Sequence, residues 1–182
     1  LAATSTGGSI TAGFINTLDP TDPSATTGTI NLTAAQQITI GDITSSGAIV
    51  LAGSQGVTLG NITTNGQVLT LTSDAGFIQT GTLNTLDPNN PAATTGIINL
   101  TAATTLNTQA ITSGGTVNLT GNTGITVPSI TTNGQALTLN GTTGTIAATS
   151  LNTLGSGGSL GTVSTTTDRK STRLNSSHEF VS

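Results

Sequence analysis

Apolar and polar residues alternate in short runs along most of this chain. In residues 28–46, for example, Ile30 and Leu32 form one run and Ile38, Ile40 and Ile43 form the next, with Thr, Asn, Gln and Gly between them. Alternation with a period of two over four or five residues is typical of a β-strand with one buried face, and β-branched residues favour strands. The pattern predicts an all-β fold of short strands separated by turns.

The runs recur in consecutive 19-residue segments. Gly28, Gly47 and Gly66 open three of them, GTINLTAAQQITIGDITSS, GAIVLAGSQGVTLGNITTN and GQVLTLTSDAGFIQTGTLN. The dipeptides Asn65–Gly66 and Asn133–Gly134 favour tight turns with positive φ. Three short strands with turns between them make one coil of a parallel β-helix, so we expect a β-solenoid of about eight or nine coils of roughly 19–20 residues, stacked roughly 4.8 Å apart.

The sequence also repeats with a longer period of 68 residues. TTGTINLTAA from Thr26 returns as TTGIINLTAA from Thr94, and ITTNGQVLTL from Ile62 returns as ITTNGQALTL from Ile130. A period kept without insertion or deletion indicates stacked blocks in equivalent places. We therefore predict one solenoid domain over residues 1–167, with a partial copy of the superrepeat at 1–27 and full copies at 28–95 and 96–163.

Equivalent positions of the two full copies keep their apolar character, whereas polar positions such as Gln36 and Thr104 differ freely. The clear exception is Ile40, which is replaced by Thr108. The repeat thus preserves a buried stripe and not a polar site. The pairs that we predict to form the core are Ile30/Ile98, Leu32/Leu100, Ile38/Leu106, Ile43/Ile111, Ile49/Val117, Leu51/Leu119, Val57/Ile125, Leu59/Val127, Ile62/Ile130, Leu69/Leu137, Leu71/Leu139 and Ile78/Ile146.

An extra stretch follows the third coil of each block, LDPTDPSATT from Leu18 and LDPNNPAATT from Leu86. Because proline cannot donate to a strand ladder, we expect these stretches to project as loops from one corner. Asp19, Asp22 and Asp87 in these loops could bind calcium. Asp22 becomes Asn in the next copy, and the third copy, LGSGGSLG, has no acid. We therefore expect plain turn chemistry and no metal site.

Residues 168–182, DRKSTRLNSSHEFVS, do not continue the pattern. They contain every Lys and Arg of the chain, its one His and its one Glu. The run DRKSTRLNSSH corresponds to the translation of a common sequencing-library adapter, so we interpret this tail as non-native and exclude it from the fold. The alternative is a genuine basic tail. Since Leu1 falls within a repeat, we expect the chain to be a fragment cut at both ends.

Residues 1–167 contain no Lys, Arg, His, Glu, Cys, Met, Trp or Tyr, and their only acids are Asp19, Asp22, Asp42, Asp74 and Asp87. General acid–base catalysis needs groups that titrate near the working pH or a close carboxylate pair. We therefore expect no enzyme activity, no catalytic residues and no cofactor. Nucleic-acid binding needs cations that neutralise phosphates, which excludes that class as well. Disorder is disfavoured because the chain is rich in regularly spaced Ile, Val, Leu and Thr and almost without charge.

Other polar and aromatic residues suggest sites less strongly. N-x-T triplets begin at Asn31, Asn61, Asn99, Asn118 and Asn140 and could accept sugar, but stacked Asn and Thr ladders are the interpretation that we favour. We expect Phe14 and Phe77 to be core or loop packing residues.

The segments NLTAAQQITIGDITSSG and TLGNITTNGQVLTLTS resemble the repeat region of filamentous haemagglutinin-type exoproteins, the large bacterial adhesins of the two-partner secretion class. The resemblance covers residues 1–167 in pattern and composition. It implies a right-handed parallel β-helix, a rigid stalk that holds binding regions away from the cell, an outer-membrane secretion partner, and a secreted or cell-surface location. Host-cell, surface or glycan ligands would be bound through regions outside this fragment.

Three functions follow from these observations. We favour a structural or adhesive stalk. The second is an ice-binding solenoid, which would need Thr-x-Thr at one fixed position in every coil; Thr70 and Thr72 fit, but Ile49 to Leu51 in the previous coil break the array. The third is a polysaccharide-cleaving β-helix enzyme, which would need clustered acids and a basic residue. An isolated solenoid fragment also exposes unpaired strand edges, so we expect end-to-end self-association or aggregation.

Overall fold

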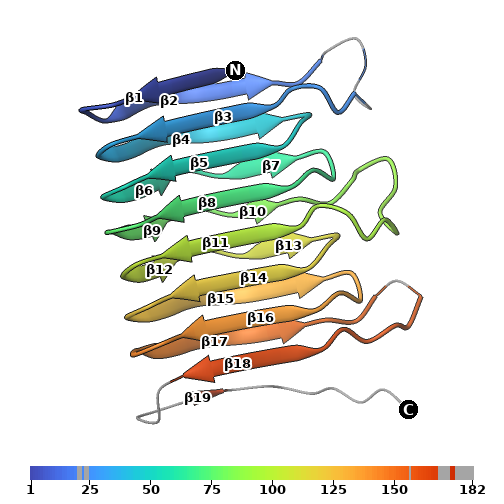
Figure 1. The fold of residues 1–182 in the computed structure, drawn as a ribbon. Helices are drawn as coiled ribbons and strands as arrows, with labels where there is room; N and C mark the ends of the chain where they lie inside the picture. The colour runs from blue at the N-terminus through green and yellow to red at the C-terminus, as the bar shows by residue number, and fades with distance from the viewer. Residues whose placement is uncertain (20–21, 23–24, 156, 168–172, 175–182) are drawn as a thin grey trace.

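The protein is a stack of β-coils in the computed structural model, which describes residues 1–19, 22, 25–155, 157–167 and 173–174. Its strands form two parallel sheets, sheet A with eight strands and sheet B with eleven. In Figure 1 the strands of sheet A lie in front and point left, those of sheet B lie behind and point right, and the chain descends from the N-terminus. The winding is right-handed, and the predicted parallel β-helix is confirmed.

Sheet A supplies one strand to each coil. Its strands, in spatial and sequence order, are β1 (Ala2–Ser5), β3 (Ile30–Ala34), β5 (Ile49–Gly53), β8 (Leu69–Ser73), β11 (Ile98–Ala102), β14 (Val117–Gly121), β16 (Leu137–Gly141) and β18 (Val163–Thr167). The eight strands correspond to eight coils, at the lower end of the expected number. At the usual strand spacing the rod is about 34 Å long between its first and last strands.

Sheet B receives the other two strand segments of each coil, either merged into one long strand or separate. The long strands are β2 (Ile10–Thr17), β4 (Gln37–Ser45), β15 (Gly124–Thr132) and β17 (Thr145–Asn152). The short ones are β6 (Gly56–Leu59), β7 (Ile62–Thr64), β9 (Phe77–Gln79), β10 (Leu83–Asn84), β12 (Thr105–Asn107), β13 (Ile111–Ser113) and β19 (Arg173–Leu174).

The ladder register explains the long period of the sequence. Ile30 pairs with Ile49, Ile49 pairs with Leu69, and Leu69 pairs with Ile98. The coil from Leu69 to Ile98 is the longest of the three because it carries a projecting loop. Three coils with one loop therefore make one block, from Ile30 to its equivalent Ile98. The corresponding coil of the next block, from Leu137 to Val163, is shorter because its loop is shorter.

The core is a set of apolar columns that run along the inside of the rod. Leu32, Leu51, Leu71, Leu100 and Leu119 pair successively across sheet A and are at most 2 % exposed. All twelve predicted apolar pairs are buried. Full burial of a Leu or Ile side chain contributes roughly 1.5–3 kcal/mol relative to leaving it in water. Each coil thus adds its own increment of core, in contact with the coils above and below.

The one polar exception to the apolar stripe is accommodated in the core. Thr108 is 4 % exposed and its hydroxyl donates to the carbonyl oxygen of Gln109 at 2.7 Å. A buried hydroxyl costs free energy only where it lacks a partner. The replacement of Ile40 by Thr108 therefore leaves no unsatisfied polar group at this position.

The turns follow the sequence signals. Gly66 and Gly134 have φ of 67° and 71°, as the two Asn-Gly dipeptides predict. At the opposite edge of the rod, a Cβ on Gly76 would collide with the carbonyl oxygen of Gln55 in the coil above. Close approach of two backbones at a corner requires glycine there.

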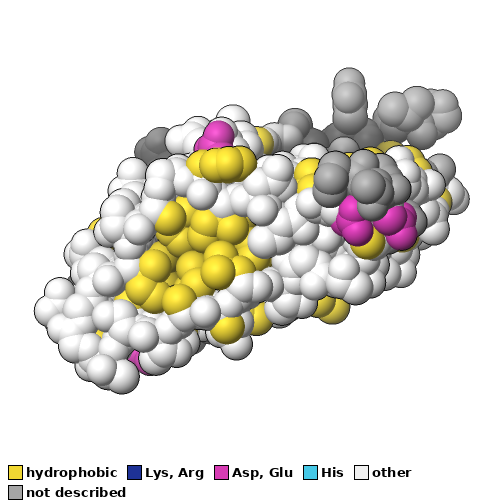
Figure 2. All heavy atoms as spheres, turned by 90° about the horizontal axis from the view of Figure 1, so that it is seen from above, with side chains coloured by type: hydrophobic (Ala, Val, Ile, Leu, Met, Phe, Trp, Pro, Cys, Tyr) yellow, Lys and Arg dark blue, Asp and Glu magenta, His cyan; other side chains and the backbone are white. Residues whose placement is uncertain are grey.

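The N-terminal end of the rod exposes its apolar interior. Figure 2, which looks onto this end, shows hydrophobic side chains gathered at its centre. Leu1 is 60 % exposed, and Ile10 and Ala12 are partly buried against the core. At the other end, β19 pairs with β17 through Ala147 and Ala148. The rest of the predicted adapter-derived tail, 168–172 and 175–182, lies outside the described residues.

Candidate functional site

The projecting loops all leave the same edge of the rod (Figure 1). Each begins at an Asn in the last two residues of a strand of sheet B. The side-chain oxygens of Asn16, Asn84 and Asn152 accept the N–H of the residue two positions later, at 2.9, 3.1 and 3.0 Å. This side-chain turn recurs at the equivalent place of each block and starts each loop in the same direction. Residues 20–21 and 23–24 of the first loop, which include both of its prolines, lie outside the described residues.

A column of buried hydroxyl groups fixes the bases of the loops. The hydroxyl of Thr17 donates to the carbonyl of Gly28 at 2.6 Å, and that of Ser45 lies 2.7 Å from the same oxygen. The hydroxyls of Thr85 and Ser113 make the same bonds to Gly96. Loop start and loop end are thereby joined inside the rod. The sequence contained a signal for this, the NT dipeptide at 16–17, 84–85 and 152–153, whose purpose the pattern alone did not reveal.

A groove of about 380 Å³ lies between the first and second loops. Its floor includes Thr44, Thr63 and Asn84, which are neighbours on the outer side of sheet B. Leu18, Leu86, Pro88 and Pro91 contribute apolar surface, and Ser45, Thr64 and Asn65 are also part of the lining. Asp87 is the one ionisable residue among the described residues of the lining. The described lining of the groove offers hydroxyl groups and apolar contacts, and it contains no acid–base pair.

The loop carboxylates that could bind calcium serve local turns. Asp19 accepts the N–H of Asp22 at 3.3 Å, and Asp87 accepts the N–H of Asn89 at 2.9 Å. These bonds are the turn chemistry that the sequence predicts. Among the described residues, no group of three or more His, Cys, Asp or Glu side chains could hold a metal ion.

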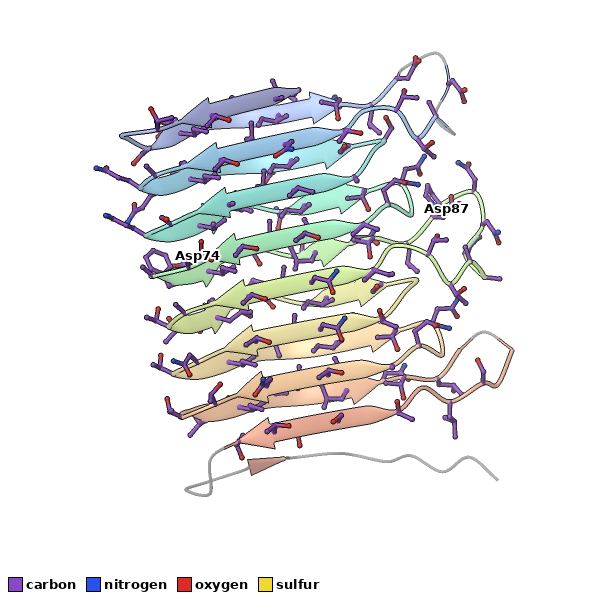
Figure 3. The ribbon with its side chains drawn as sticks, in the orientation of Figure 1. Asp74 and Asp87 are labelled. Atoms are coloured by element: carbon purple, nitrogen blue, oxygen red, sulfur yellow. The ribbon has the colours of Figure 1, made fainter. Side chains whose placement is uncertain are left out.

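The other carboxylates are dispersed over the rod. Figure 3 shows Asp74 and Asp87 at opposite edges. Asp42 lies at a corner of sheet B, where its Oδ1 accepts the N–H of Asn61 at 2.7 Å. The described part of the chain also contains no helix long and apolar enough to cross a membrane.

The Thr array follows a register that differs by one residue from the predicted one. Thr70 and Thr72 pair with Val50 and Ala52, not with Ile49 and Leu51, which point into the core. The array is still interrupted at this coil, but elsewhere it is more regular than expected. From β8 to β18 every outward position of sheet A is Thr, Asn or Ser. We call this set the outer array: Thr70, Thr72, Asn99, Thr101, Asn118, Thr120, Thr138, Asn140, Ser164 and Thr166.

Most asparagines of the N-x-T triplets stand in these outward columns. Asn99 and Asn118 are register partners, and the Asn118 amide donates to Oδ1 of Asn99 at 2.9 Å. Asn31 and Asn140 lie on the same face. Asn61 lies at a corner and accepts hydrogen bonds from the backbone and hydroxyl of Thr82 at 3.0 and 2.8 Å. The predicted Asn ladder is confirmed for the Asn99–Asn118 pair.

The two phenylalanines differ in their environment. Phe77 is half-buried, and its ring covers Gly56 of the preceding coil. Phe14 is 64 % exposed, so its prediction as a packing residue is wrong. It pairs with Asp42 on the outer side of sheet B, in the first coil of the stack.

No family model, no curated protein and no solved structure matches this chain.

Proposed function

We propose that this chain is a repeat segment of a non-catalytic structural stalk, or adhesive repeat region, in a large secreted or surface-attached bacterial protein of the filamentous haemagglutinin type. The observation that carries the proposal is the coil-by-coil register. Leu51, for example, pairs only with Leu32 above and Leu71 below. In such a stack, length grows with the number of blocks and needs no new core design.

The distribution of chemical groups supports a passive role. Among the described residues that line the groove between the loops, Asp87 alone has a carboxylate, and the carboxylate of Asp74 lies at the opposite edge. Glycan-cleaving β-helix enzymes need clustered acids, and we therefore favour the stalk over that alternative. Purified protein should leave acidic and neutral polysaccharides uncleaved.

The edge of the rod that carries the loops also offers the stalk repeated places for ligand binding. The loops leave the rod at equivalent points. In each loop the backbone N–H of a Leu, at 18, 86 or 154, donates to the side chain of the Asn two residues earlier. A surface or glycan ligand bound between two loops would therefore meet a further pair of loops one block on, although the third loop, LGSGGSLG, has no acid or proline. Export through an outer-membrane partner, with folding coil by coil outside the cell, fits a chain whose residues 1–167 have neither Cys nor basic side chains.

Surface display of a ligand-binding module tests the stalk. The module is placed at the end of one, two or more copies of residues 28–95 on a bacterial surface, and binding to ligand-coated beads is measured in the presence of long surface polysaccharide. Binding should increase with copy number. A flexible Gly/Ser linker of equal chain length is the control, because a random coil gains reach only with the square root of its length. Equal binding through the solenoid and the linker would refute the stalk.

A further inference from the structure

The outward face of sheet A presents a continuous array of small polar groups. Over five successive strands, β8, β11, β14, β16 and β18, the two outward positions carry only Thr, Asn and Ser. The coil above interrupts the array with Val50 and Ala52, and Asn31 and Thr33 resume it. Val has nearly the same shape as Thr, so at Val50 the surface loses a hydroxyl but keeps its contour.

The array is periodic in two directions. Neighbouring positions along the rod are separated by the strand spacing of about 4.8 Å, and the two outward positions of one strand by about 6.7 Å. The strands stack with little rotation between successive coils (Figure 1). Side chains are ordered along the column where Asn118 donates to Asn99 at 2.9 Å. β-branched Thr side chains have few χ1 rotamers, which keeps their methyl and hydroxyl groups in repeated positions.

The chemistry of the array disfavours the usual macromolecular ligands. It contains no charged residue and no aromatic ring, whereas protein interfaces are enriched in Tyr, Trp, Phe, Met and Arg. Sugar rings commonly stack on aromatic side chains, and none belongs to the array. A rigid lattice of uncharged hydroxyl, amide and methyl groups instead matches a surface that is itself a lattice of hydrogen-bonding groups.

We propose that the outer array binds ice. Its hydroxyl and amide groups would hold water in a regular layer between rows of methyl groups, at spacings close to the oxygen repeats of the ice lattice, and this layer would merge with the crystal surface. The bound ligand is therefore water in the solid state. This activity goes beyond the stalk and does not depend on it, since it needs only the five strands that carry the array.

The test uses the full chain and two double variants with substitutions in the same coils. Thr101→Tyr with Thr120→Tyr places two bulky rings in the centre of the outer array, on β11 and β14. Thr112→Tyr with Thr131→Tyr places the same rings on the outer side of sheet B, on β13 and β15, where these two residues are register partners. Circular dichroism establishes that both variants keep the β-fold.

Thermal hysteresis and the shape of growing ice crystals are then measured for the three proteins. The proposal expects hysteresis and faceted crystals for the parent and the sheet B variant, and their loss in the sheet A variant. Absence of hysteresis in the parent, or equal loss in both variants, would overturn it. Either result leaves the stalk intact, because that proposal depends on block number and reach.

Discussion

The side-chain amide of Asn133 donates a hydrogen bond to the carbonyl oxygen of Pro91 at 3.1 Å, although the two residues are far apart in the sequence. It also donates to the carbonyl of Ala93 at 3.3 Å. Asn133 belongs to the turn after β15, whereas Pro91 and Ala93 belong to the second projecting loop, which leaves the rod two coils above. This side chain thus helps to hold the loop against the rod, together with the backbone bond from the N–H of Gly66 to Leu86 at 3.3 Å.

Replacing this side chain should release the loop without unfolding the rod. Asn133→Ala removes two hydrogen bonds of about 0.5–1.5 kcal/mol each, and the freed carbonyls can bind water. Amide hydrogen exchange of residues 86–95 should become faster, with little change in the global unfolding midpoint. Asn122→Ala, an exposed Asn in the turn after β14, is the control. Unchanged exchange in the loop would show that Asn133 does not restrain it.

The buried hydroxyl column should be sensitive to loss of a hydroxyl but not to an added methyl. Ser113 is 1 % exposed, and its Oγ donates to Gly96 at 2.8 Å and accepts the N–H of Gly115 at 3.2 Å. Ser113→Ala leaves the N–H of Gly115 without this partner, while the Gly96 carbonyl keeps the bond from Thr85. An unsatisfied buried donor costs roughly 1–3 kcal/mol of unfolding free energy.

Ser113→Thr is the matched control for that change. Thr occupies the equivalent place at Thr64, Thr85 and Thr132, which are all buried. Denaturant unfolding should therefore give a nearly parental free energy for the Thr variant. Equal destabilisation by Ala and Thr would mean that packing volume, and not the hydroxyl, matters here.

Adjacent residues of β5 should respond very differently to truncation. Leu51 is fully buried, whereas Val50 is 39 % exposed on the outer face. Leu51→Ala should lower the unfolding free energy by about 2–5 kcal/mol, and Val50→Ala should change it by about 0.5 kcal/mol or less. Chemical denaturation of both variants measures the difference. Similar losses would contradict the inward and outward assignment of this strand.

The apolar N-terminal end should drive association of the isolated chain. Ala3 pairs with Leu32 in an inner column, whereas Ala2 pairs with Asn31 in an outer one. Ala3→Lys places a charge at the mouth of the core and should suppress end-to-end contact. Ala2→Lys should have a much weaker effect. Sizing with light scattering measures both variants, and a monomeric parent protein would contradict the prediction.

The fold could be predicted from sequence because its signal is local and repeated. Ile30 and Leu32 alternate with polar residues, and their equivalents Ile98 and Leu100 do the same, so the buried face of each strand follows from the sequence. The projecting loops were predicted from Pro88 and Pro91, which cannot join a ladder. Each of these features depends on a property of the residue itself, the polarity of its side chain or, for proline, the missing backbone N–H.

The features that were missed depend on contacts between coils. The bond from Asn133 to Pro91 joins two coils, and its partner is a backbone carbonyl that has no sequence signal. The register error that paired Thr70 with Ile49 assumed a coil of about 21 residues here, whereas Thr70 pairs with Val50 in a coil of 20 residues. A shift of one residue exchanges the two faces of a strand. Phe14 was misplaced because an aromatic residue was assumed to be buried.

Small-angle scattering on chains with inserted copies of residues 28–95 tests the central claim most directly. Each inserted block adds three coils and should lengthen the rod by about 14 Å at an unchanged cross-section. Ala3→Lys can be included in every chain so that association does not contribute to the length. A constant increment per block is the result that a continuous solenoid predicts. A growing cross-section, or an increment that varies from block to block, would contradict it.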